Sequence, residues 1–305
     1  MKKLQYKYII IFLLVLIINL FTKDCISSNY KYNSPHYRYN PPEKLNDGWE
    51  ISSLDSEGIN TELIEYLINN IYSNKFDQYE NIHSVLIIRN GKLLLEEYFN
   101  GSNGEILHDQ HSVTKSFCSA LVGIAIDHQF IKSVNDPIKI YLPEYHYINW
   151  EHTYQSATKG KIDITIHHLL TMSAGLEWDE WKTKYSDPNN SHNKMDHSFD
   201  QVKYVLERPL VAEPGTMFTY NSGLAIILGK IISNSINIEF DTFATKYLFE
   251  PLGINNHEWR MFPSGIYQTE GGLKLRPRDM AKFGLLYLNN GKWNNQQIIS
   301  EKWIK

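Results

Sequence analysis

The spacing of apolar residues predicts a helix followed by a β-hairpin near the start of the folded region. Apolar side chains recur every three or four positions from Ile59 to Ile71, which is the period of one face of a helix. Two apolar runs within residues 83–99 then flank Asn90-Gly91, a dipeptide that favours the two-residue turn of a hairpin. We therefore expect a helix and then two paired strands.

The middle of the chain predicts mainly helices. Residues 113–128 keep a continuous 3.6-residue apolar period. Further segments with this period, separated by loops that contain Pro and Gly, lie at 166–172, 199–207, 223–234, 241–248 and 277–289. Strands that are followed by helices predict an α+β fold, with a mostly helical region inserted between pieces of one sheet.

The first 27 residues predict an export signal. Residues 1–7 are cationic, and residues 8–21 form an apolar run that is short for a membrane span and typical of a signal peptide. Small residues at Cys25 and Ser27 favour cleavage after Ser27. The alternative is an uncleaved membrane anchor, and in either case we expect a secreted or periplasmic protein.

The remaining chain divides into a linker and one domain. Residues 28–50 mix Pro, Asn, Ser and Tyr without an apolar period, which predicts a linker. The folded domain is expected at 51–305. Cleavage after Ser27 would remove Cys25 and leave Cys118 without a partner, so we expect no disulfide and a buried, hydrophobic Cys118.

Composition and charge favour a small-molecule or peptide partner. Of the 305 residues, 42% are hydrophobic, enough for a sizeable core. The net charge is −4, and without residues 1–27 it becomes −7, because 26 basic residues face 33 acidic ones. An acidic domain cannot neutralise phosphates, so nucleic acid is not an expected partner. Membrane contact is expected only through the N-terminal segment, if it is uncleaved, and the oligomeric state cannot be predicted.

Ser112 and Lys115 match the pattern S-x-x-K, which places a hydroxyl and an amine one helical turn apart. The pattern also occurs at Ser28, Ser156 and Ser191, but only at Ser112 does it open a strongly amphipathic helix. A cation in the first helical turn costs about 0.3–1 kcal/mol, which penalises the charged form and suits a neutral, catalytic lysine. The alternative is an ordinary capping serine beside a solvent-exposed lysine.

Tyr220 begins a second motif, Tyr220-Asn221-Ser222, which follows a Pro-Gly turn and precedes an apolar helix. A phenol beside a Ser/Lys pair can relay a proton from the serine oxygen to a leaving group. The alternative is a core tyrosine at the start of a helix.

These motifs, in this order and separation, resemble the serine β-lactamase/penicillin-binding-protein-like family. The resemblance is strongest to class C β-lactamases, related esterases, D-aminopeptidases and 6-aminohexanoate-oligomer hydrolases, and it covers roughly residues 80–305. Other segments similar to family signatures are Asp136-Pro137-Ile138, Tyr141-Leu142-Pro143-Glu144, residues 166–176, Gly271-Gly272-Leu273 and residues 277–284.

The resemblance implies a β-lactamase/transpeptidase-like fold, with an antiparallel sheet flanked by helices, and a mechanism without a metal or organic cofactor. Ser112 would be acylated, Lys115 would be its base, and Tyr220 would protonate the leaving group and help to activate the deacylating water. The backbone N–H of Ser112 would serve as one oxyanion donor. Ser222 stands where class C enzymes have Asn, so its contact with the substrate or Lys115 is expected to be less complete. This departure is similar to the 6-aminohexanoate-hydrolase and esterase branch.

The third motif of the family, K-T-G or H-x-G on a strand, does not follow Tyr220 in this sequence. Since the chain ends at Lys305, before the closing strands that the resemblance implies, we expect a C-terminally incomplete domain that lacks one wall of its pocket. Two alternatives to an enzyme stay open: a non-catalytic penicillin-binding or sensor protein on the same scaffold, and an inactive truncated remnant.

Trp178 and Trp181 are candidates for an apolar rim that binds an acyl chain or peptide, unless they pack within their own loop. No metal site is predicted from the twelve histidines, because His167 and His168 are adjacent on a predicted helix, and His192 and His197 lie in a predicted polar loop. The substrate stays open among a β-lactam, a D-amino-acid peptide, an ester and an ω-amino amide.

Overall fold

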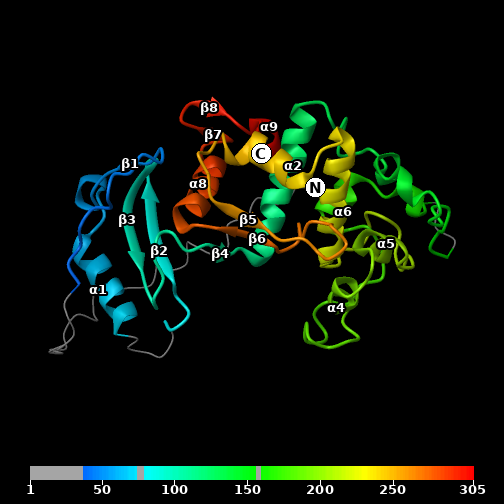
Figure 1. The fold of residues 1–305 in the computed structure, drawn as a ribbon, viewed down its shortest axis with the longest axis horizontal. Helices are drawn as coiled ribbons and strands as arrows, with labels where there is room; N and C mark the ends of the chain where they lie inside the picture. The colour runs from blue at the N-terminus through cyan, green and yellow to red at the C-terminus, as the bar shows by residue number, and fades with distance from the viewer. Residues whose placement is uncertain (1–36, 74–78, 156–158) are drawn as a thin grey trace, which may run out of the picture. The chain divides into compact units, whose positions relative to one another are not determined.

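The computed structural model describes residues 37–73, 79–155 and 159–305 (Figure 1). The predicted signal peptide and the first part of the predicted linker lie outside these residues. The second part of the linker differs from the prediction, because the folded unit already begins at Arg38. Tyr39 Oη donates a hydrogen bond of 2.7 Å to the carbonyl of Leu94, and Trp49 is fully buried. Tyr39 and Trp49 hold this segment on the domain, and two isolated aromatic residues produce no apolar period in the sequence.

The first sheet contains the predicted hairpin, which is confirmed. Strands β2 (Ser84–Arg89) and β3 (Lys92–Tyr98) are antiparallel, and the turn residues Asn90 (φ 51°) and Gly91 (φ 77°) both have the left-handed backbone of a tight hairpin turn. The short strand β1 (Glu50–Ile51) adds in parallel to β3. The predicted N-terminal helix is α1 (Thr61–Tyr72).

A second sheet positions the segments on either side of the candidate site. Strand β6 (Leu273–Leu275) lies between β4 (His108–Asp109) and β5 (His257–Trp259), antiparallel to both. Strands β7 (Lys292–Trp293) and β8 (Gln296–Gln297) pair separately. Among the described residues the strands therefore form three small sheets, whereas the sequence predicted pieces of one.

The predicted helices are present, most of them with ends within one or two residues of the prediction. They are α2 (Thr114–Asp127), α3 (Ile166–Leu170), α5 (Gln201–Leu206), α6 (Ser222–Ile236), α7 (Phe240–Ala244) with a π-helical continuation (Thr245–Phe249) and α8 (Pro277–Leu288). A short helix, α9 (Glu301–Ile304), follows β8. Short 3₁₀ turns lie at Asp55–Glu57, His111–Val113, Ile138–Tyr141, Pro143–Tyr145 and Lys161–Asp163. The α+β class is confirmed.

One helix was not predicted. Helix α4 (Ser191–Asp196) occupies a segment that the sequence analysis treated as a polar loop. Asn190 caps it, since its side-chain oxygen accepts a hydrogen bond of 2.9 Å from the N–H of His192. Met195 is the one fully buried apolar side chain of this short helix, so no apolar period marks it in the sequence.

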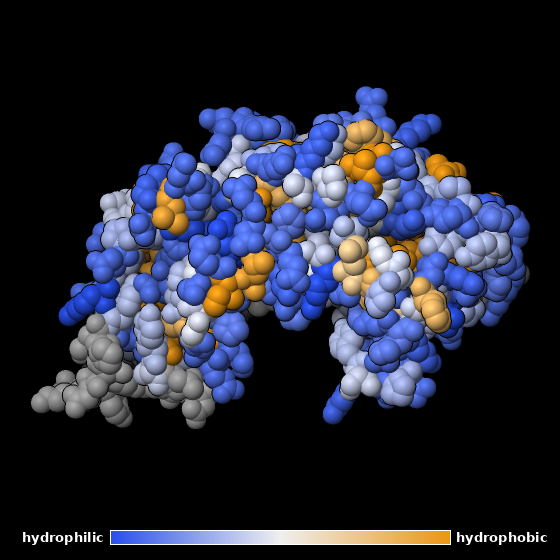
Figure 2. Space-filling model, in the orientation of Figure 1, coloured by the Kyte–Doolittle hydropathy of each residue, from blue (hydrophilic) through white to orange (hydrophobic). Residues whose placement is uncertain are grey.

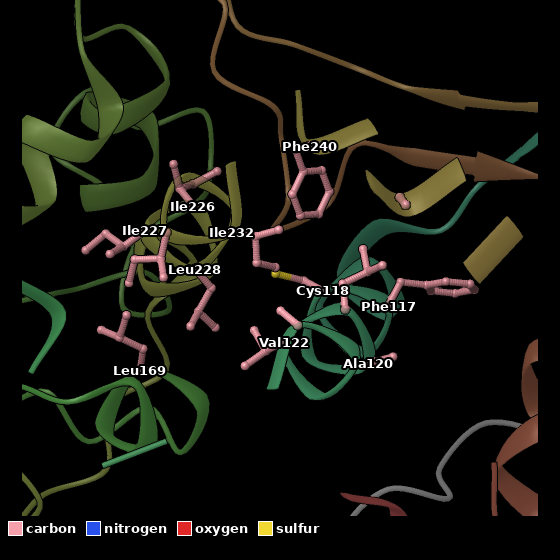
Figure 3. Packing of buried hydrophobic residues seen from close by; sticks show 14 of the residues in the cluster. Phe117, Cys118, Ala120, Val122, Leu169, Ile226, Ile227, Leu228, Ile232 and Phe240 are labelled. Atoms are coloured by element: carbon pink, nitrogen blue, oxygen red, sulfur yellow. The ribbon is translucent and has the colours of Figure 1, made fainter. Parts of the chain in front are cut away.

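The core is centred on the packing of α2 against α6, whose apolar side chains face each other in Figure 3. Cys118 of α2 is fully buried, and its Sγ lies 3.8 Å from the carbonyl oxygen of Ala225 in α6. Burial raises the pKa of Cys118 to about 12. The prediction of a buried, hydrophobic Cys118 is confirmed.

Apolar residues on the face shown in Figure 2 form small, separate patches among hydrophilic ones. Within the described residues, no single helix has the length and apolar composition to span a membrane, and α6 with the α7 segment meets these criteria only as a pair bent by 79°.

The close approach of α6 to Thr269 generates a stability prediction. A Cβ atom on Gly229 would lie 2.5 Å from Thr269 Cγ2, and the Thr269 hydroxyl donates a hydrogen bond of 2.7 Å to the carbonyl of Ala225 in α6. Overpacking of this kind costs about 1–3 kcal/mol. We therefore expect Gly229→Ala to lower the free energy of unfolding by that amount in denaturant titrations.

Gly284 in α8 supplies the matched control, because a Cβ atom there would meet nothing within 4 Å. We expect Gly284→Ala to leave stability unchanged or to raise it by up to about 1 kcal/mol through helix propensity. Equal unfolding midpoints for the two variants would contradict the packing described here.

Candidate active site

Ser112 lies on a tight turn between β4 and α2. The preceding residue, His111, has a φ of 44°, which is unusual for a residue with a side chain. The turn is fastened to β6 by two hydrogen bonds, one of 2.8 Å from the N–H of Gln110 to the carbonyl of Leu273 and one of 3.3 Å from the N–H of Leu273 to Thr114 Oγ1. The Ser112 side chain is thereby exposed at the start of α2.

The three residues predicted to be catalytic come together at this turn. Ser112 Oγ and Tyr220 Oη share a hydrogen bond of 2.7 Å. Lys115 Nζ lies 3.1 Å from Ser112 Oγ and donates a second hydrogen bond, of 2.7 Å, to the backbone carbonyl of Glu270. The serine hydroxyl therefore contacts an amine and a phenol at once. Both distances are short enough for a nucleophile to exchange a proton with its base.

Of the two tryptophans predicted to line the site, one lies beside it. Trp181 is 69% exposed and stacks on the ring of Tyr220, with 4.7 Å between ring centroids. Trp178 is buried, and its indole N–H donates a hydrogen bond of 2.8 Å to Glu180 Oε2. Only Trp181 is placed where an apolar group next to Tyr220 would contact it.

Ser222 points away from Ser112, toward a buried carboxylate that the sequence analysis did not single out. Ser222 is 2% exposed, its N–H donates to Glu180 Oε2 at 2.9 Å, and its hydroxyl donates to Glu180 Oε1 at 2.6 Å. Glu180 also accepts a hydrogen bond of 3.0 Å from Tyr185 Oη. Its side chain thus holds the first turn of α6, which directly follows Tyr220, against the loop of Trp178 and Trp181.

Glu270 is a second buried carboxyl group that the sequence analysis missed. Its side chain is close to the Lys115 amine, its residue is 5% exposed, and its Oε2 accepts no hydrogen bond from the described residues. Burial raises the pKa of Glu270 to about 7, even though the nearby Lys115 and His192 lower it. Glu270 directly precedes Gly271-Gly272, in a segment otherwise similar to a family signature. An acidic residue at this position was the signal by which the sequence could have identified it.

Two further side chains lie beside Glu270, and they correct the expectation for His192. His192 and Asp196 are one helical turn apart on α4, with His192 Nδ1 3.3 Å from Asp196 Oδ2. The nitrogen and oxygen atoms of His192, Asp196 and Glu270 that could ligate a metal all lie within 4.8 Å of one another. The predicted polar loop was therefore wrong for His192, which lies on α4.

Comparison with known proteins places most of the chain in one family. The family model described as beta-lactamase matches residues 83–304. A 6-aminohexanoate-dimer hydrolase of Paenarthrobacter ureafaciens is 23% identical over 231 residues, which are 72% of this chain and 55% of that protein. The chain thus spans about half the length of this relative.

Solved structures show the same fold at low sequence identity. A protein of Bacillus anthracis, provisionally named a 6-aminohexanoate-dimer hydrolase, superposes with a TM-score of 0.60 at 24% identity and covers 72% of this chain and 57% of its own. FmtA of Staphylococcus aureus superposes with a TM-score of 0.57 at 18% identity and covers 86% of this chain and 72% of its own.

The contacts of Glu180 generate a prediction about the architecture of the site. Glu180→Gln replaces one accepting oxygen by an NH₂ group that faces N–H and O–H donors of Trp178, Ser222 or Tyr185. Leaving a buried donor unsatisfied costs about 1–3 kcal/mol, so we expect the free energy of unfolding to fall by that amount. Glu177→Gln, an exposed change in the same loop, is the control and should be neutral. Equal destabilisation by both variants, measured by denaturant titration, would count against Glu180 as the residue that fastens α6.

Proposed function

The chain belongs to the beta-lactamase family of serine hydrolases, and on that premise we propose that it cleaves an ester or amide bond through an acyl-enzyme on Ser112. The family model covers most of the chain, and the solved structures share its β-lactamase/transpeptidase-like fold. The observation that carries the proposal is the contact of Ser112 Oγ with both Lys115 Nζ and Tyr220 Oη.

In the acylation step, Ser112 Oγ attacks the substrate carbonyl carbon while its proton passes to the neutral amine of Lys115. The backbone carbonyl of Glu270 accepts a hydrogen bond from that amine and so fixes its direction. The backbone N–H of Ser112, near the positive end of the α2 dipole, stabilises the oxyanion that forms on the carbonyl oxygen.

Tyr220 carries the proton onward in this proposal. Its hydroxyl is within hydrogen-bond reach of Ser112 Oγ, so it can deliver a proton to the leaving amine or alcohol and later take one from the water that attacks the acyl-enzyme. Lys115 Nζ lies 5.2 Å from the centroid of the Tyr220 ring, so the amine and the phenol lie on the same side of Ser112 Oγ as close neighbours.

The substrate we propose is a small amide or ester with an apolar part. Support comes from the exposed ring of Trp181 beside Tyr220 and from the relative that is named a 6-aminohexanoate-dimer hydrolase. The contacts of Ser222 are taken up by Glu180, so its hydroxyl does not serve as the asparagine of class C enzymes would. We further propose that the protein acts outside the cytoplasm, on the basis of the apolar run at 8–21.

Replacing the nucleophile tests the proposal directly. We expect Ser112→Ala to abolish labelling of the full chain by a fluorophosphonate probe, measured as the covalent mass increase of the intact protein. Hydrolysis of short p-nitrophenyl esters should fall by roughly 10⁴- to 10⁶-fold.

Ser116→Ala is the matched control for this experiment, since Ser116 lies one turn further along α2 and is outside the Ser112–Lys115–Tyr220 hydrogen bonds. Undiminished labelling of the Ser112→Ala protein would refute the assignment. Stable labelling by a fluorescent penicillin without any turnover would favour the penicillin-binding or sensor function instead.

The proposed proton transfers predict different effects for two conservative changes. Lys115→Arg keeps the positive charge but cannot lose a proton at neutral pH, so we expect the acylation rate to fall as far as in Lys115→Ala. Tyr220→Phe keeps the ring under Trp181 and should lower turnover by roughly 10²- to 10⁴-fold. Stopped-flow measurement of acylation and deacylation checks both. An arginine variant that retains most of the activity would show that Lys115 acts through its charge and not as a base.

A further inference from the structure

A cluster of one imidazole and two carboxyl groups lies next to the proposed catalytic lysine. His192 and Asp196 come from α4, and Glu270 comes from the segment before β6 whose backbone carbonyl accepts the Lys115 hydrogen bond. These side chains take no part in the acyl transfer proposed above. We propose that His192, Asp196 and Glu270 form a site for one divalent transition-metal ion of the zinc type.

The spacing of the donor atoms fits such an ion. Donors at about 2.0–2.2 Å from a tetrahedral zinc are roughly 3.3–3.6 Å apart. His192 Nδ1 and Asp196 Oδ2 are 3.3 Å apart, and the donor atoms of all three residues lie within 4.8 Å of one another.

The burial of Glu270 supplies an independent observation. Glu270 is 5% exposed, and neither Glu270 Oε2 nor Asp196 Oδ1 has a hydrogen-bond donor among the described residues. A buried carboxylate oxygen without a hydrogen-bond donor is costly, because it has lost its hydration. A cation beside Glu270 Oε2 would give this oxygen a partner and balance the negative charges of the two carboxylates.

The donor set favours zinc over calcium or magnesium. An imidazole nitrogen suits Zn²⁺ and neighbouring transition metals, whereas Ca²⁺ and Mg²⁺ prefer sites built of oxygen alone. Three protein ligands leave a fourth position for water. Access is open from α4, since the side chains of His192 and Asp196 are 19% and 36% exposed.

An ion at this site would act on Lys115 through space. Lys115 already interacts electrostatically with Glu270, and its amine is fixed to the Glu270 backbone. Bound metal would therefore place a positive charge close to the proposed base.

The test uses the full chain, treated with EDTA and dialysed, and titrated with Zn²⁺ in a calorimeter. We expect one equivalent of Zn²⁺ to bind at this site, with at least 10- to 100-fold weaker binding in His192→Gln, Asp196→Asn and Glu270→Gln. His197→Gln is the matched control, because His197 neighbours Asp196 on the chain but is exposed and hydrogen-bonded to the carbonyl of Asn193. It should bind like the unmodified protein.

A second measurement distinguishes loss of the metal site from loss of the fold. Zn²⁺ should raise the thermal midpoint of the unmodified and His197→Gln proteins and leave that of Glu270→Gln unchanged, while circular dichroism without metal shows that all variants are folded. Co²⁺ should give the visible absorption bands of a four- or five-coordinate site, and Glu270→Gln should lose them.

Two results would overturn the proposal. One is the same Zn²⁺ affinity in Glu270→Gln as in the unmodified protein, which would assign the binding to scattered surface histidines. The other is no Zn²⁺ binding at all. Failure of Ser112 labelling leaves this proposal standing, since the metal titration requires no activity.

Discussion

The site depends on the position of one amine. Lys115 Nζ spans the distance between Ser112 Oγ and the backbone carbonyl of Glu270, and so joins the first turn of α2 to the segment that enters β6. The two segments are 155 residues apart in sequence. If the side chain of Lys115 extended into solvent, Ser112 would be an exposed hydroxyl without a base. The fastening of the 108–114 turn to β6 through Gln110 and Thr114 prevents this, because it fixes the distance that the lysine has to span.

The core beneath the site fixes the position of Tyr220 in a similar way. Tyr220 directly precedes α6, which packs along α2 through apolar residues on both helices (Figure 3). Ser112 lies just before α2, and Tyr220 lies just before α6. The packing of the two helices therefore sets the distance between the hydroxyl groups of Ser112 and Tyr220. Glu180 completes this arrangement by holding the first turn of α6 against the loop that presents Trp181. Ser112 can therefore be exposed while the residues that fix its surroundings are buried.

The sequence allowed prediction of those parts of the site that local spacing determines. Ser112 and Lys115 belong to one helical turn, and Asn90-Gly91 requires only its own backbone angles. Tyr220 was found through the order of motifs in a family, because its contact with Ser112 is not local. Ser222 and Trp178 were assigned to substrate, but both side chains turn toward Glu180, a long-range pairing that no period reveals. The proximity of His192, Asp196 and Glu270 was missed for the same reason, since α4 has one fully buried apolar residue and Glu270 is distant in sequence.

Glu180 and Glu270 are both buried, but their side chains have different surroundings. Glu180 accepts hydrogen bonds from Ser222, Trp178 and Tyr185, so its charge is compensated within the protein and its role is to hold other groups in place. Glu270 is buried to the same degree, yet its Oε2 has no donor in the described part of the chain, and its neighbours are a histidine and a second carboxylate. A fold can retain such a group only if protonation or a ligand offsets the cost of burying it. Glu270 also orients Lys115, the proposed base, through its backbone carbonyl. A group bound to the Glu270 side chain would therefore lie close to that base.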